Sequence, residues 1–138
     1  MGLGAAIYTR LTGHAGTTAL VSTRVYPNTA PQDATLPYVV YEQESARRLE
    51  TFGGSSGNAR AVVEIAAWDE TYDGARALGE QIRLALEGFS GTVASVVIDY
   101  VTLDGDRDEY FAPGSGEEVG LHSVDQDYGF WFQETVPP

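Results

Sequence analysis

The residues most suggestive of chemistry are three aspartates at alternate positions, Asp104, Asp106 and Asp108. This spacing matches the first three oxygen ligands of a calcium-binding EF-hand loop. The rest of that loop pattern is missing, because Glu109 stands where the loop needs glycine and Ser115 stands where it needs a bidentate glutamate. We therefore interpret the segment as an exposed acidic hairpin tip. A calcium-binding interaction module is the alternative of a different functional class.

No catalytic constellation can be assembled from the other candidate residues. His14 lies beside glycines in a predicted loop, His122 lies near the start of a predicted strand, and neither belongs to a known nucleophile motif. The glycine-rich run 53–57 lacks the lysine of a phosphate-binding loop. The chain has no cysteine, which excludes disulfides and thiolate metal sites. We predict that the protein is not an enzyme and that it holds no cofactor and no metal.

The remaining candidates are residues suited to protein contact. Arginine beside aromatic or large apolar side chains is typical of interface hot spots. Two predicted loops carry such residues, and the opposing interpretation is that these loops fold back and bury them. The candidate interface residues are Arg47, Arg48, Leu49 and Phe52 in the first loop and Tyr110 and Phe111 in the second.

Composition restricts the partners. The 138 residues include 20 acidic residues and only eight basic ones, all arginine, which gives a net charge of −12. Such a chain repels nucleic acid unless its arginines cluster, and they do not. No apolar run approaches the roughly 20 residues of a membrane span, and the N-terminus lacks the pattern of a signal peptide. We expect one domain over residues 1–138, with no membrane partner.

One central run, residues 60–89, combines a strand pattern with a helix pattern. Its first part alternates with period two, which predicts a strand. Ala61, Val63, Ile65 and Ala67 lie on one face of it. From Thr71 the apolar residues recur at helical spacing, with Thr71 or Asp69 as the N-cap and Gly88 as the stop. The predicted buried stripe of that helix consists of Tyr72, Ala75, Leu78, Gly79, Ile82, Ala85 and Leu86.

The other elements are predicted in the same way. We expect a first helix over residues 3–11, a helical turn near 17–23, a short edge strand at 25–26, and strands over 38–44, 92–103 and 121–134. Long loops are predicted at 45–59 and 104–119. Consecutive strands without an intervening helix favour antiparallel pairing. We predict an α+β, two-layer fold with a mostly antiparallel sheet of about four to five strands and helices packed on one face.

The order of these segments resembles a known family of virion proteins. The segment from Arg24 to Tyr41 contains Tyr26-Pro27 and LPYVVY, and it precedes the run VEIAAWDETYDGARALGEQIRLAL. An aspartate-rich hairpin and a closing strand with DYGFWFQE follow. Together these resemble the tail-completion, or tail terminator, family of long-tailed phages and phage-like gene transfer agents.

This resemblance implies a structural protein of the virion. It implies a homohexameric ring that caps the tail tube protein at the head-proximal end of the tail and joins it to the head connector or stopper protein, with assembly in the bacterial host cytoplasm. It implies that DNA passes through the bore without specific binding, which suits an acidic subunit. A neck or head-completion adaptor of the same particle is the alternative. The resemblance assigns no catalytic residue and no particular interface residue.

Overall fold

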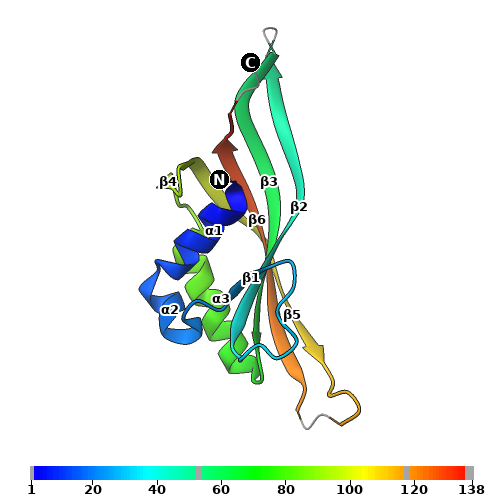
Figure 1. The fold of residues 1–138 in the computed structure, drawn as a ribbon. Helices are drawn as coiled ribbons and strands as arrows, with labels where there is room; N and C mark the ends of the chain where they lie inside the picture. The colour runs from blue at the N-terminus through cyan, green and yellow to red at the C-terminus, as the bar shows by residue number, and fades with distance from the viewer. Residues whose placement is uncertain (1, 52–53, 117–118, 136–138) are drawn as a thin grey trace.

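The computed structural model describes residues 2–51, 54–116 and 119–135. Two helices begin the chain, a third follows the third strand, and six strands form one sheet (Figure 1). The helices are α1 (Leu3–Thr12), α2 (Ala15–Val21) and α3 (Tyr72–Leu86). The strands are β1 (Val25–Pro27), β2 (Tyr38–Thr51), β3 (Gly54–Asp69), β4 (Gly91–Val93), β5 (Val96–Phe111) and β6 (Leu121–Gln133).

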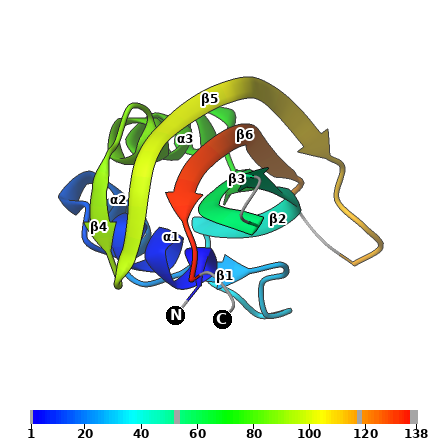
Figure 2. The ribbon, with the colours of Figure 1, turned by 90° about the horizontal axis from the view of Figure 1, so that it is seen from above.

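The sheet has the strand order β1-β2-β3-β6-β5-β4. Only β1 runs parallel to its neighbour, β2, and every other pairing is antiparallel. The pairing register shifts between Gln43 and Ser45 on β2, and between Leu103 and Gly105 on β5. Such irregularities increase the local twist, and Figure 2 shows β5 and β6 curving strongly.

All three helices cover one face of the sheet, and the core lies between the two layers (Figure 1). The inward residues of β3 fit the predicted period-two pattern, because Ala61, Val63, Ile65 and Ala67 are all buried. From β6, Tyr128 and Phe130 are the bulkiest buried side chains. Burial of these apolar groups is the main stabilising contribution to the fold.

Helix α3 confirms the predicted helix closely. Its buried residues are those of the predicted stripe, except that Tyr72 at the first position is 49% exposed. Thr71 is the N-cap, and its hydroxyl oxygen accepts a hydrogen bond from the Gly74 amide at 3.0 Å. Gly88 follows the helix end with a φ of +76°, in the left-handed region that glycine adopts without steric cost.

The predicted α+β class is confirmed, but three details of the sheet were wrong. The sheet has six strands, not four or five. Residues 45–51 and 54–59 extend β2 and β3 as a long hairpin, and residues 104–111 extend β5, where loops were expected. The expected strand over 92–103 is a hairpin of β4 and β5, joined by a turn at Ala94 and Ser95.

Among the described residues, no helix is long and apolar enough to cross a lipid bilayer.

Candidate interaction surfaces

Two strands present long edges of the sheet. β1 pairs with β2 only over Val39–Tyr41, so β2 from Glu42 to Arg48 has no strand beside its outer edge in the described chain. β4 likewise pairs with β5 only near its start, up to Ile98. The rest of β5, from Tyr100 to Phe111, therefore forms the opposite edge. Unpaired strand edges are natural sites for pairing with another chain.

The first group of predicted interface residues lies on the projecting β2–β3 hairpin. Arg47, Arg48 and Leu49 are exposed at the distal end of β2, while Phe52 lies outside the described residues. Arg48 is held by Glu134, with Nε and Oε1 2.8 Å apart. These residues belong to a strand and not to the expected loop.

The second group, Tyr110 and Phe111, lies at the other end of the sheet, where β5 ends (Figure 1). Phe111 packs against Trp68 of β3 with ring centroids 5.2 Å apart, and Tyr110 packs against His122 at 4.8 Å. Both aromatic rings remain about half exposed. The structure therefore separates the two predicted groups.

The sheet face turned away from the helices, which we call the open face, carries an acidic groove. The groove measures about 290 Å3 and is lined by residues from four strands. Arg107 is its one arginine, and its side chain forms ion pairs with four carboxylates. These are Glu64 at 2.6 Å, Asp127 at 3.1 Å, Glu109 at 3.6 Å and Asp125 at 3.9 Å. Sequence reasoning missed this cluster because its members come from three separate strands.

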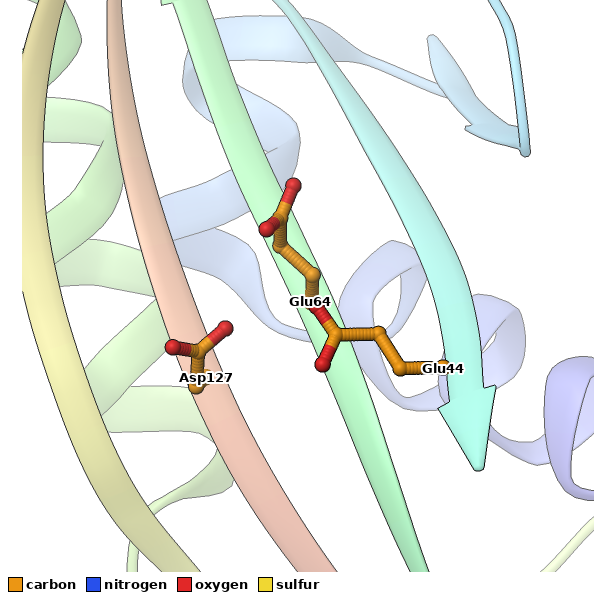
Figure 3. Close-up of side chains that lie close together, drawn as sticks. All are labelled: Glu44, Glu64 and Asp127. Carbon is orange, nitrogen blue, oxygen red and sulfur yellow. The ribbon is translucent and has the colours of Figure 1, made fainter. Parts of the chain in front are cut away.

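Three carboxylates of this region lie close enough to bind a metal ion. Oxygens of Glu44, Glu64 and Asp127 all lie within 4.8 Å of one another (Figure 3). Partial desolvation, followed by the charges of Asp127 and Glu64, raises the pKa of Glu44 above its ordinary value. The guanidinium of Arg107 already binds Glu64 and Asp127, so the arrangement is that of an ion-pair cluster.

Asp125 differs from its neighbours because its carboxyl group is buried. The residue is 5% exposed. Burial, and then the adjacent Glu109 carboxyl and the charge of Glu64, raise the pKa of Asp125 to about 7. Removing a carboxylate from water disfavours its charged form, and nearby like charges act in the same direction. Asp125 is thus a proton-binding group in the floor of the groove.

The three aspartates with calcium-ligand spacing do not converge. Asp104 accepts a hydrogen bond from Arg60 on the open face. Asp106 and Asp108 instead bind Arg76 of α3, at 2.8 and 3.0 Å. The expected exposed hairpin tip was therefore wrong: these residues belong to β5, and their carboxylates are divided between the two faces of the sheet.

The histidines take part in ordinary side-chain contacts. The His14 ring lies 3.3 Å from the side-chain oxygen of Gln81, which ties the start of α2 to α3. His122 packs between Tyr72 and Tyr110. Neither contact forms a nucleophile–base pair.

Comparisons with known proteins identify a similar fold and a matching family. The chain is similar to a protein chain in the structure titled "Virion of native gene transfer agent (GTA) particle", with a TM-score of 0.74 and 19% identity over 95% of this chain and 94% of that one. At this identity the likeness establishes the fold. No curated protein sequence matches the chain. Residues 5–133 match the family described as Tail completion protein gp17. The chain therefore belongs to the tail completion protein gp17 family and is a structural protein of a virion tail.

Proposed function

We propose that this protein is the tail terminator, a subunit whose homohexameric ring caps the tail tube at its head-proximal end. The observation that carries the proposal is the presence of two long open edges, β2 and β5, on opposite sides of one sheet. A subunit with two different complementary edges forms head-to-tail contacts. Such contacts close into a ring when the rotation between neighbouring subunits is a whole-number fraction of a full turn. Membership of the tail completion family supports placement in the tail.

The partners follow from this position. One side of the ring contacts the tail tube protein, and the other contacts the head connector or stopper protein. Each subunit adds a charge of −12, so the bore repels the DNA phosphates and lets the genome pass without binding it. A basic bore in the assembled ring would contradict this part of the proposal.

The role has no chemical step. A ring at the end of the tube occupies the surface to which the next tube subunit would add, and it thereby fixes tube length. Its outer surface then serves as the docking face for the head. The interaction surfaces described above suit adhesion between subunits and perform no bond making or breaking.

Growth of tail tubes in vitro tests the proposal. The tail tube protein is polymerised with increasing amounts of this protein, and tube length is measured over time by electron microscopy. A terminator stops elongation when about six copies are bound per tube. Mass photometry of the assembled species checks for six times the subunit mass of 14.8 kDa. A neck adaptor would leave elongation unchanged, which would overturn the terminator role.

A further inference from the structure

The acidic groove has more negative charge than its own arginine can neutralise. Four carboxyl groups surround the single guanidinium of Arg107. Even when the buried Asp125 holds its proton, three carboxylates remain for one guanidinium. Glu42 also lines the groove, and its side chain is exposed. Carboxylates that share one cation repel one another. The groove therefore favours a second cation supplied from outside.

The groove can be reached across the β5 edge. Arg107, Glu109 and Phe111 line it from β5, which has no strand on its outer side in the described chain beyond Ile98. Glu109 is the exposed carboxylate nearest this edge, and it holds Arg107 only at 3.6 Å. A side chain from a neighbouring subunit would meet Glu109 first.

Arg47 is the chain's best candidate for that cation. It is exposed on the outer edge of β2, and it forms no ion pair with any side chain that the structure describes. Its direct partner across the strand pair is Arg60, a like charge, which is unfavourable. Arg60 is already bound to Asp104 at 2.9 Å, and its guanidinium lies over the Trp131 ring. A carboxylate from another subunit would relieve the repulsion.

The directions of the strands permit this contact. Successive antiparallel pairings of β2, β3, β6 and β5 make β2 and β5 run in opposite directions. Within one subunit Arg47 is level with Tyr100 of β5 and not with Glu109. An antiparallel pairing that is shifted along the strands, with residues 45–51 of β2 beside residues 105–111 of the next subunit's β5, would set Arg47 opposite Glu109 and continue the sheet. Arg47 pairs with Arg60, which lies on the same face of β3 as Glu64. Arg47 would thus arrive on the open face, where the groove lies.

We propose that Arg47 of one subunit enters the acidic groove of the next subunit and pairs with Glu109, an inference that rests on the ring proposed above. The contact supplies a local attraction between subunits that each carry a charge of −12. Complementary charges at an interface fix register and suppress wrong partners. Arg47 is therefore a specificity-determining residue for ring closure.

Charge reversal tests the pair. Arg47→Glu is compared with Arg83→Glu, which makes the same change in net charge on α3, away from both sheet edges. Mass photometry of equal concentrations is expected to show ring formation reduced at least tenfold in Arg47→Glu and unchanged in Arg83→Glu. Glu109→Arg is expected to reduce it similarly, and the double variant Arg47→Glu/Glu109→Arg is expected to recover it. Rising salt should weaken the wild-type ring.

Three results separate the possible failures. Rings of Arg47→Glu as abundant as those of the wild type would overturn the pair and leave the proposed ring intact. If the double variant Arg47→Glu/Glu109→Arg melts at the wild-type temperature but forms no rings, the Arg47–Glu109 pair is likewise overturned and the proposed ring stays intact. A wild type that stays monomeric even on tail tubes would overturn the ring itself. If Glu109→Arg fails to fold, Glu109→Gln removes the charge with little change in shape and must still weaken the ring.

Discussion

Asp125 is a buried residue whose protonation is linked to the stability of the fold. In the folded protein it keeps its proton up to about pH 7, whereas the ordinary value for an aspartate is 3.8. The stability contributed by the neutral carboxyl is present at low pH and is lost as pH rises through 7. This sign is opposite to that of an ion-paired aspartate.

Asp125→Asn should therefore make the protein less sensitive to alkaline pH. Urea unfolding compares the two proteins at pH 5.5 and pH 8. The free energy of unfolding of Asp125→Asn minus that of the wild type should be about 1–2 kcal/mol larger at pH 8 than at pH 5.5. The reason is that each unit of pKa difference between the folded and unfolded states is worth about 1.4 kcal/mol. Asp127→Asn is the control, because it removes a carboxylate bound to Arg107 at 3.1 Å and should lower stability at pH 8. An unchanged pH dependence in Asp125→Asn would contradict the assignment.

Gly129 gives Arg60 the space to cross β6 and reach Asp104. A Cβ atom at Gly129 would lie 2.6 Å from Nη2 of Arg60 and 2.7 Å from the Thr102 hydroxyl. Gly129→Ala should cost about 1 kcal/mol, because the crowded side chains must shift and the Arg60–Asp104 pair is displaced. The free energy of unfolding measures this loss.

A double-mutant cycle identifies the cause of that loss. In an Arg60→Ala background, Gly129→Ala should cost clearly less than it does alone, since the displaced guanidinium is gone. Equal costs in both backgrounds would show that crowding of Arg60 is not responsible.

Helix α3 is fixed to the extended half of β5 by Arg76. Its guanidinium donates to Asp106 and Asp108, and Gln126 beneath donates to the Gly79 carbonyl at 3.0 Å. Arg76→Met should lower the free energy of unfolding by about 1–2 kcal/mol, because two carboxylates lose their partner. Arg83→Met, which loses the same charge but pairs only within α3, should cost less than about 0.5 kcal/mol. Chemical denaturation of both variants checks the difference, and equal losses would contradict it.

The elements that could be predicted from sequence are those that bury one face against the other layer. Helix α3 and the central part of β3 show clear helical and period-two patterns because their inward residues meet the core. The distal half of β2 extends beyond the helices, and the distal half of β5 meets α3 in the described chain only through the side chains of Tyr72 and Arg76. Their residues are mostly exposed, so their sequence carries no apolar alternation and was interpreted as loop.

The short hairpin of β4 and β5 was hidden for a different reason. Its turn holds Ala94 and Ser95 at φ values of +49° and +66°. Such turns usually contain Asn-Gly or Asp-Gly, which is the signal that sequence reasoning uses. The apolar residues on both sides of this turn therefore resembled one continuous strand.

The candidate interface residues remain a prediction, but the structure shows where all of them except Phe52 lie. Arg47 and Phe111 were identified by type, and the structure places them on the two open edges of the sheet. The cluster around Arg107 was not foreseen, because pairing across β3, β6 and β5 depends on register and no local pattern records it. Residue types in the sequence indicated which side chains suit contact with another protein. Their positions in space depend on the strand pairing of the sheet, which the sequence pattern does not reveal.

At the scale of the whole molecule, the net charge opposes association between subunits, whereas the open strand edges favour it. A net charge of −12 keeps separate subunits apart in solution. In the proposed ring, the two open edges of the sheet would supply directional contacts that overcome this repulsion when subunits meet in the correct order. Assembly on the tail tube would then be favoured over aggregation, because misaligned subunits repel.

Electron microscopy of the protein bound to tail tubes tests the central claim most directly. Purified protein carrying a small gold label is mixed with tubes and imaged in negative stain, alongside tubes without the protein. We predict a single ring of six labels at one end of each tube, the end that joins the head. Labels distributed along the tube, or gathered at its distal tip, would contradict the account.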